Sequence, residues 1–287
     1  MVKKSVFKPS LNKVSKMKTI IVATDFSSNA LNASMYALKM AQIINADVLL
    51  FNVYELMPNF EDPIIVMNIV DLKAIAENDI ETFKNELLKS TATKLNILTQ
   101  VKLGVFANEL NEICDNIKPY LLIMGSQGKT AAERIMFGGH TADALKNCTW
   151  PLITVPYNAS FSAFKNIGIA YDFKKEITED FITEIKLLAN DFNSNIHIIN
   201  AAKEDEFDGD FILLSNKINK MFEAHKIEFH FVEGEHIDKS TMDFAEKNNI
   251  DLLIVMRMHH TLWEKIISRS HTKEMVLHSH VPVLLLR

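Results

Sequence analysis

Four of the eight glycines in this 287-residue sequence lie in one short stretch: Gly125, Gly128, Gly138 and Gly139. His140, Thr141 and a helical pattern follow directly. Glycine has no Cβ, so main-chain N–H groups there can approach phosphate oxygens, and the N-terminus of the next helix adds unpaired donors and a partial positive charge. The segment therefore favours a phosphate-binding cradle. The alternative is that these glycines only satisfy positive φ angles in tight turns.

Two more common nucleotide motifs do not fit this sequence. Residues 128–130 resemble the end of a Walker A loop, but that motif requires a glycine where this chain has Ile123. Dinucleotide-binding folds carry G-x-G-x-x-G after the first strand, and this chain has Asp25-Phe26-Ser27 there. The glycine stretch is therefore neither a P-loop nor a dinucleotide fingerprint.

The elements that must position this stretch alternate between apolar runs and amphipathic helical patterns. In the first half we expect strands over 18–24, 46–53, 97–103, 121–124 and 151–155, with helices through 31–44, 71–91, 106–116 and 141–147. In the second half we expect strands over 166–171, 195–201, 227–232, 251–255 and 281–286, with helices over 176–190, 211–225, 239–248 and near Thr272. Ser27 or Ser28 is the natural N-cap of the first helix.

Strands that are apolar on both faces and separated by helices form a buried parallel sheet, because parallel neighbours need crossover connections that cover the faces. The expected fold is α/β: two doubly wound domains in tandem, each a five-stranded parallel sheet with strand order 3-2-1-4-5. Ligands of such sheets bind beyond the carboxyl ends of strands one and four. Thr24-Asp25 ends the first strand and Gly125-Ser126 ends the fourth, so these residues should meet at one crevice.

The two halves are related by an internal repeat in which residues 121–124 (LLIM) fall on 252–255 (LLIV) without gaps. We therefore expect a mobile N-terminal arm over 1–17, a first domain over 18–157 and a second over 165–287. On the same shift the four clustered glycines become Met256, His259, Arg269 and Ser270. Their side chains would fill the space that a pyrophosphate needs, so no nucleotide is expected in the second domain.

The composition excludes several classes of protein. A formal net charge of −5 at pH 7 and a pI of about 6.1 argue against a nucleic-acid-binding surface, which needs a basic excess. No apolar run reaches about 18 residues, and none follows the Lys-rich N-terminus, so neither a membrane span nor a signal peptide is expected. Cys114 and Cys148 lack C-x-x-C spacing, which indicates reduced thiols in a cytoplasmic protein.

Nine of the ten histidines lie in the second half, but their spacing is not typical of a metal site. His278-x-His280 lacks the i, i+4 spacing of a helix, and His259-His260 and His271 have no ordered Cys or carboxylate pair beside them. We interpret them as partly exposed polar residues, with anion binding in the protonated form as the alternative. No nucleophile, base and orienting group occur together. Metal ligands and catalytic residues are therefore not predicted.

At these motifs the sequence resembles the universal stress protein family, whose ATP-binding branch carries G-x2-G-x9-G-(S/T) after the fourth strand. The resemblance covers nearly the whole chain as two tandem copies, and the first copy carries it in VATDFS (22–27), Asn52-Val53 and MGSQGKT (124–130). It implies that Asp25 and the main chain of Val53 hold adenine or ribose. It also implies that ribose and phosphates contact Gly125, Gly128, Gly138 and the donors through Thr141, with Lys129 as an added positive charge.

One residue departs from the family pattern. The ATP-binding branch has Ser or Thr where this chain has Gly139, so one hydroxyl contact is missing. Thr141, two positions further on at the start of the helix, is the candidate replacement.

The resemblance implies a tandem universal stress protein whose first domain binds ATP, alone or with Mg²⁺, as a regulatory ligand in the stress response. Two alternatives stay open: slow ATP hydrolysis involving Asp25 or a metal-bound water, and an interaction scaffold that needs no nucleotide. Domains of this family pair along their final strands, so the resemblance also implies either a homodimer or an internal pair of the two domains.

Overall fold

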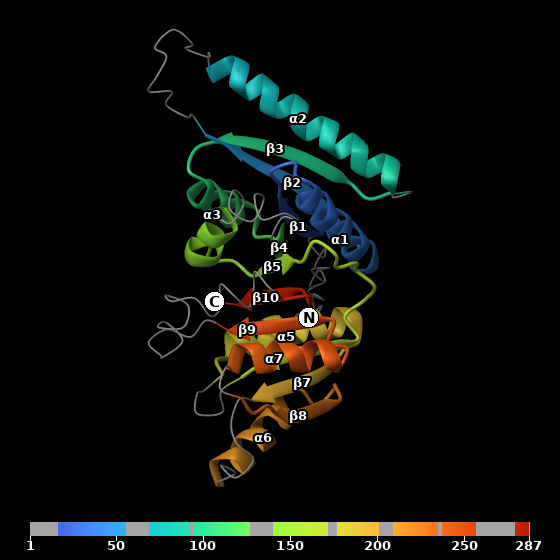
Figure 1. Cartoon of the computed structure of the whole chain (residues 1–287), viewed down its shortest axis with the longest axis vertical. Helices are drawn as coiled ribbons and strands as arrows, with labels where there is room; N and C mark the ends of the chain where they lie inside the picture. Colours follow the sequence, from blue (N-terminus) through green and yellow to red (C-terminus); the bar gives the residue numbers. More distant parts are fainter. Residues whose placement is uncertain are drawn as a thin grey trace, which may run out of the picture.

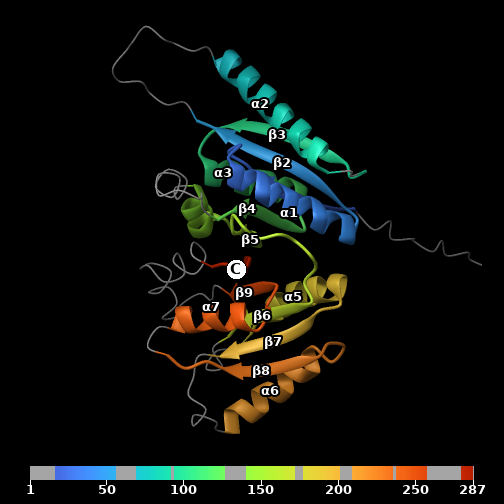
Figure 2. The ribbon, with the colours of Figure 1, turned by 45° about the vertical axis from the view of Figure 1, so that its right-hand side comes forward.

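The computed structural model describes residues 17–55, 69–91, 94–126, 140–171, 177–200, 209–234, 237–256 and 279–286. Its strands are stacked along the long axis of the molecule, and helices cover both faces of the sheet they form (Figure 1). The view turned by 45° shows the first half at one end of this stack and the second half at the other (Figure 2).

The first half contains β1 (Lys18–Ala23), α1 (Ser28–Ile44), β2 (Ala46–Tyr54), α2 (Ile69–Ser90), β3 (Ile97–Leu103), α3 (Phe106–Ile117), β4 (Leu121–Gly125), a helical segment over residues 140–147, and β5 (Leu152–Val155). The second half contains β6 (Asn166–Ala170), α5 (Glu179–Phe192), β7 (Asn195–Asn200), α6 (Gly209–Met221), β8 (Ile227–Phe231), α7 (Ile237–Lys247), β9 (Leu252–Met256) and β10 (Val283–Leu286). The predicted alternation of strands and helices is confirmed for these residues. The expected N-terminal arm through residue 16 and the helix near Thr272 lie outside them.

Capping residues set the ends of several helices. Ser27, one of the two predicted caps, is the N-cap of α1, and its side-chain oxygen accepts a hydrogen bond from the Ala30 N–H at 3.2 Å. Helices α1 and α5 end at Asn45 and Asn193, whose φ angles of 51° and 52° are left-handed. Asparagine tolerates this conformation better than most residues. Helix α5 follows the N-cap Thr178 and so begins later than the predicted residue 176.

The ten strands of the described residues form one sheet in the order β3-β2-β1-β4-β5-β10-β9-β6-β7-β8. Each half has the predicted order 3-2-1-4-5, and its strands are parallel. The sequence predicts five strands in each half, and the family resemblance implies that the halves pair along their final strands. In the structure β5 and β10 do pair, antiparallel, with Val283 opposite Thr154 and Leu284 opposite Ile153, so the two halves share one sheet. This pairing satisfies main-chain groups that would otherwise lie at two open sheet edges.

Two buried clusters lie on opposite faces of the sheet. Ile20 and Val22 of β1 belong to the larger cluster together with residues of α1, whereas Ile21 and Ala23 belong to the smaller one together with residues of α3. The larger cluster continues into the second half through Ile167. Burial on both faces explains why the strands are continuous apolar runs in the sequence.

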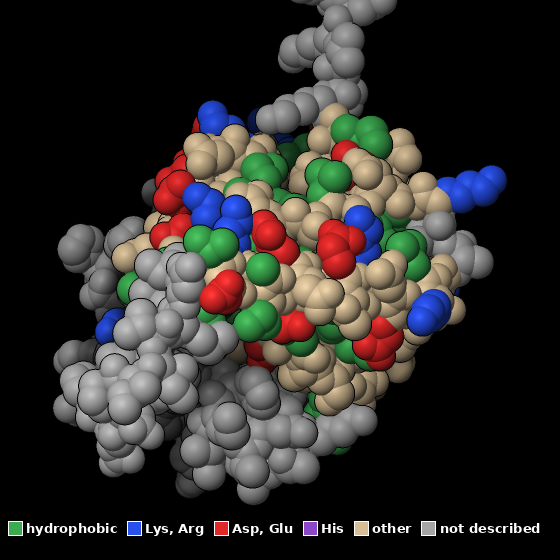
Figure 3. Space-filling view, turned by 90° about the horizontal axis from the view of Figure 1, so that it is seen from above, with side chains coloured by type: hydrophobic (Ala, Val, Ile, Leu, Met, Phe, Trp, Pro, Cys, Tyr) green, Lys and Arg blue, Asp and Glu red, His purple; other side chains and the backbone are tan. Residues whose placement is uncertain are grey.

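Helix α2 forms one end of the molecule and has a solvated outer face. Acidic and basic side chains are interspersed over the described part of this face (Figure 3). Ion pairs one helical turn apart join Lys73 to Glu77 at 3.5 Å and Lys84 to Glu81 at 3.7 Å. Such exposed pairs each contribute only a few tenths of a kcal/mol, roughly, so packing of the opposite face holds the helix in place.

A polar contact links the two halves beside the sheet. Lys18 Nζ lies 2.6 Å from Asp191 Oδ1 and 4.7 Å from the centre of the Tyr120 ring. Tyr120 donates its hydroxyl hydrogen to Asp191 Oδ2 at 2.6 Å. Burial raises the pKa of Tyr120, and its hydrogen bond to Asp191 raises it further, so the hydroxyl stays protonated at neutral pH. Because Lys18 and Tyr120 belong to the first half and Asp191 to the second, the contact fixes their relative orientation.

Glu184 on α5 is a partly buried carboxylate whose Oε2 has no hydrogen-bond partner. Burial raises the pKa of Glu184, and the negative charge of Asp180 raises it further. A folded-state pKa above the unfolded value means that stability falls as pH rises between the two values. We therefore expect Glu184→Gln to raise the free energy of unfolding at pH 7, by about 0.5 kcal/mol after allowance for partial exposure.

The measurement is urea denaturation of Glu184→Gln and the unaltered chain at pH 7 and at pH 4. The gain should shrink at pH 4, where the glutamate is largely protonated in both states. An equal gain at both pH values, or a loss at pH 7, would contradict the assigned cause.

Candidate functional site

A pocket lies where the carboxyl ends of β1 and β4 meet, at the switch point of the strand order in the first half. Its described lining residues come from β1, β2, β4, the start of α1, α3 and the helical segment over 140–147: Ala23, Thr24, Asp25, Ser27, Asn29, Ala30, Asn52, Val53, Phe106, Met124, Gly125, Ser126, His140 and Thr141. The structure thus brings together seven of the residues proposed from sequence: Thr24, Asp25, Val53, Gly125, Ser126, His140 and Thr141. The other four, Gly128, Lys129, Gly138 and Gly139, lie outside the described residues.

The end of β1 presents an exposed carboxylate to the pocket. Thr24 continues the strand ladder through its N–H, which donates to the Phe51 carbonyl at 2.9 Å. The Asp25 side chain then closes a short turn, because its Oδ1 accepts from the Ser27 N–H at 3.1 Å. This bond holds the carboxylate in one orientation. Its second oxygen remains available to accept a hydrogen bond from a ligand hydroxyl.

The end of β2 extends past the end of β1. Asn52 Nδ2 donates to the Thr24 carbonyl at 2.8 Å and so ties the two strand ends together. Main-chain groups of successive strand residues face alternate sides, and the Phe51 carbonyl faces β1. The N–H and C=O of Val53 therefore face the same side, beyond the last residue of β1. This main-chain edge is suited to pair with the donor and acceptor edge of a planar heterocycle.

Position 125 needs a glycine because its main chain lies close to the Asn29 side chain, and not because the chain turns there. A Cβ at this position would lie 2.3 Å from Asn29 Nδ2 and 2.7 Å from Asn29 Cγ. The φ angle of Gly125 is not in the left-handed region, so the alternative of a turn glycine is wrong for this residue. Asn29 is only 7% exposed, and its Oδ1 is buried without a hydrogen-bond partner. An acceptor of this kind in a pocket wall can bind a donor that the protein itself does not supply.

The segment after β4 is anchored by hydrogen bonds to its neighbours. Ser126 N–H donates to the Val155 carbonyl at 2.9 Å, and the Thr141 hydroxyl donates to the Gly125 carbonyl at 3.2 Å. This second bond uses the hydrogen of Thr141 but leaves its oxygen able to accept. His140 is the first described residue of the helical segment and packs edge-on against Phe106, with ring centres 4.8 Å apart.

Four polar or aromatic lining residues were not proposed as site residues from the sequence: Ser27, Asn29, Asn52 and Phe106. Of these, Ser27 was expected as a helix cap and Asn52 belonged to the family motif. A weak signal exists for Asn52, a polar residue directly after a run of apolar residues, whereas Asn29 is one of several polar residues in α1. Asn29 stands in the first turn of α1, and Asn52 follows the buried run 48–51 of β2. The signal for Phe106 is absent, since an aromatic residue at the start of a helix is common.

The corresponding place in the second half is filled by a side chain. Met256, which takes the position of Gly125 on the internal repeat, is 6% exposed and belongs to the larger buried cluster. The other three replacements lie outside the described residues.

A ten-stranded sheet of two doubly wound halves defines the class of this molecule as a tandem α/β protein. The model of the universal stress protein family matches residues 16–156 and 163–287. The chain therefore belongs to the universal stress protein family, in its tandem form.

Individual relatives agree with this assignment. A universal stress protein of Methanocaldococcus jannaschii is 29% identical over 138 residues, which cover 48% of this chain and 81% of that protein. The crystal structure of a universal stress protein from Archaeoglobus fulgidus superposes with a TM-score of 0.71 at 17% identity, over 94% of this chain and 96% of the other. A putative universal stress protein of Pseudomonas aeruginosa gives a TM-score of 0.58 at 13% identity, over 94% and 93%. These likenesses show the shared fold. In the described residues, no helix has the length and apolar character needed to cross a membrane.

Proposed function

We propose that the first half of this universal stress protein binds ATP in the pocket between β1 and β4, as a regulatory ligand. The observation that carries the proposal is the Asn29 Oδ1 atom, a buried acceptor in the pocket wall that lacks a donor. A nucleoside offers such donors in its ribose hydroxyls and its exocyclic amine. The adjoining Asp25 carboxylate and the Val53 main-chain edge have complementary chemistry.

Each lining group has a defined role in this proposal. The Val53 N–H and C=O would pair with adenine, and Asp25 would accept a hydrogen bond from a ribose hydroxyl. The sequence-predicted helix start near Thr141 would direct main-chain N–H groups toward the phosphates. The family resemblance adds Gly128, Lys129, Gly138 and Gly139 to the phosphate contacts.

The described lining supports binding more than catalysis. Asp25 is its sole carboxylate, and one of its oxygens already accepts from the Ser27 N–H. The one other possible base among the described lining residues is His140, whose ring packs edge-on against Phe106. ATP occupancy would then act by changing shape or partner choice, and hydrolysis, the alternative, would be slow.

We further propose that residues 18–157 and 165–287 form the two domains and act as an internal pair. The antiparallel pairing of β5 with β10 supports this, because it joins the final strand of each half. The second domain is proposed to bind no nucleotide, since buried Met256 occupies the position of Gly125.

Calorimetric titration of ATP into the full-length protein, with and without Mg²⁺, tests the proposal. Asp25→Ala should weaken binding by about 10- to 100-fold, because one charge-assisted hydrogen bond is lost. The matched control is Asp172→Ala, the aspartate that ends the first predicted strand of the second half, and it should bind like the unaltered chain. GTP should bind more weakly, because the N–H and C=O of Val53 would match the hydrogen-bonding groups of adenine and not those of guanine.

Absence of any saturable signal at millimolar ATP would reject the proposal in favour of the nucleotide-independent scaffold. Equal losses in the two aspartate variants would reject the assignment to the first half. Turnover that depends on Asp25 in repurified protein would instead favour the ATP hydrolase.

A further inference from the structure

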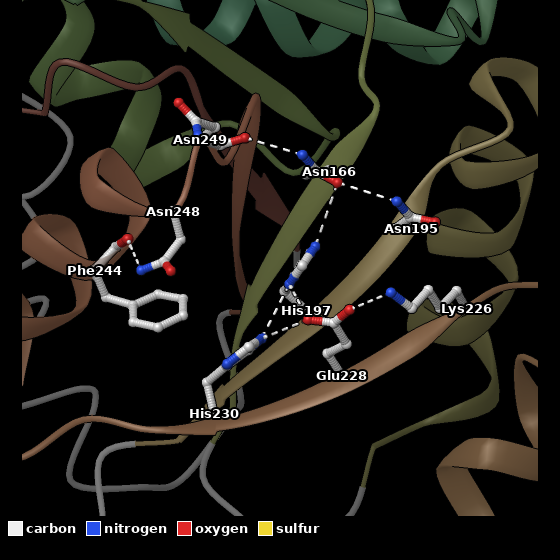
Figure 4. Close-up of polar contacts among 9 residues, drawn as sticks. All are labelled: Asn166, Asn195, His197, Lys226, Glu228, His230, Phe244, Asn248 and Asn249. Atoms are coloured by element: carbon white, nitrogen blue, oxygen red, sulfur yellow. Dashed lines mark hydrogen bonds and ion pairs between the residues drawn. The ribbon is translucent and has the colours of Figure 1, made fainter.

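The second half contains three potential metal ligands far from the pocket: His197 on β7, and Glu228 and His230 on β8. His197 is paired with Glu228 in the strand register, and His230 lies two residues beyond Glu228. Residues two apart on a strand share a face, so all three side chains project from the same face of the sheet. Figure 4 shows them converging on one point. We propose that His197, Glu228 and His230 bind one divalent transition-metal ion, best matched by Zn²⁺.

The distances between the ligand atoms fit a single small ion. His197 Nδ1 lies 3.0 Å from His230 Nε2, and Glu228 Oε2 lies 3.7 Å from each of these nitrogens. Ligand atoms of a tetrahedral Zn²⁺, each about 2.05 Å from the ion, are about 3.3 Å apart. The observed spacings bracket this value, so side-chain shifts of a few tenths of an ångström, roughly, would complete the site.

Asn166 orients the ring of His197 from behind the proposed ion. Asn166 Nδ2 donates to the Asn249 carbonyl, and Asn166 Oδ1 accepts from Asn195 Nδ2, both at 3.2 Å. These bonds orient the amide so that its oxygen faces His197 Nε2 at 3.4 Å. This contact favours the tautomer with the hydrogen on Nε2, in which the Nδ1 lone pair faces His230 Nε2, 3.0 Å away, and the proposed ion. Ligating histidines usually donate their second ring nitrogen in this way (Figure 4).

The contacts of Glu228 leave one of its carboxylate oxygens for the proposed ion. Lys226 Nζ lies 2.6 Å from Glu228 Oε1, so Oε2 is the oxygen left for the ion. Lys226 is 68% exposed, so solvent screens its repulsion of a cation.

The donor set selects the class of metal. Two imidazoles and one carboxylate suit Zn²⁺, Cu²⁺ or Ni²⁺, whereas Mg²⁺ and Ca²⁺ prefer oxygen ligands only. The Glu228 side chain is 38% exposed, so the fourth position faces solvent and the ion can reach the site. Because β8 is the outermost strand of the sheet, the ion would cross-link this edge to β7.

The test is titration of ZnCl₂ into full-length protein prepared without a histidine tag and stripped with a chelator. We expect one Zn²⁺ per chain by calorimetry, and visible absorption of tetrahedral Co²⁺ when that ion is substituted. His230→Gln and Glu228→Gln should each weaken Zn²⁺ binding by about 100-fold or more, since loss of even a second-shell partner costs about 10- to 100-fold. The control His280→Gln alters an exposed histidine outside the cluster and should bind like the unaltered chain.

Several outcomes would overturn the proposal. They are the absence of saturable Zn²⁺ binding, the persistence of full binding in both Glu228→Gln and His230→Gln, and an equal loss in His280→Gln. Far-UV circular dichroism of each variant identifies any loss that results from unfolding. Glu228→Gln is the decisive variant in that case, because it changes a partly exposed side chain at constant shape.

Discussion

The variant Gly125→Ala is expected to lose ATP binding and to unfold at a lower urea concentration than the unaltered chain. Its added Cβ would lie 2.3 Å from Asn29 Nδ2, well inside contact distance. Asn29 is buried in the first turn of α1, so the side chain that gives way would move into the proposed nucleotide pocket. We expect a loss of about 1–3 kcal/mol in the free energy of unfolding and a drop of more than about tenfold in ATP affinity.

Two further variants separate the steric effect from a general weakening of the sheet. Gly168→Ala adds a Cβ to β6 at 3.0 Å from Ile199 Cδ1 and should lower stability without changing ATP binding. The double variant Asn29→Ala/Gly125→Ala removes the clashing side chain. Its loss in the free energy of unfolding should therefore be smaller than the sum of the losses in the two single variants. Full ATP affinity in Gly125→Ala, or no coupling in the double variant, would contradict the role assigned to this contact.

The variant Leu284→Asp should prevent stable folding or lower the free energy of unfolding by more than about 4 kcal/mol. Leu284 is 2% exposed on β10, where it lies opposite Ile153 of β5 and Ile254 of β9. An aspartate there would bury a charge without a partner in the seam that joins both halves. Because the larger cluster runs through this seam, both halves should lose structure together.

Urea denaturation followed by far-UV circular dichroism measures this effect. The matched control is Leu98→Asp on β3, the same substitution at a strand position that is 47% exposed. It should change stability by no more than about 1 kcal/mol. Similar denaturation midpoints for Leu284→Asp and Leu98→Asp would contradict the importance of the seam.

Much of the candidate pocket could be predicted from the sequence, because the prediction required only the positions at which the strands end. Apolar runs placed the ends of β1 and β4 beside Asp25 and Gly125, and the switch-point rule for doubly wound sheets brought those ends together. The role of Asn29 could not be predicted in the same way. Whether its Oδ1 is paired depends on every group packed around it, and no local pattern records that.

The proposed metal site likewise could not be predicted from local sequence patterns. The sequence analysis considered His278, His280 and their neighbours because they are close along the chain. The geometry that favours a metal ion instead combines His197 with Glu228 and His230, which two parallel strands bring together across the α6 crossover. Parallel strand pairing brings together residues that are far apart in the sequence. A search for ligand spacings along the chain therefore does not find such a site.

The sequence by itself determined the fold class, the tandem repeat, the strand order and the location of the crevice. Those features follow from periodic apolar patterns and from chirality rules, which act on neighbouring residues or on whole elements. The family resemblance implied pairing along the final strands, but only the tertiary structure gave the antiparallel register of β5 and β10. Only the tertiary structure also showed that Gly125 lies against Asn29 and that His197 and His230 lie beside Glu228. Each of these depends on a contact between distant segments, set by packing to within an ångström, which no local pattern specifies.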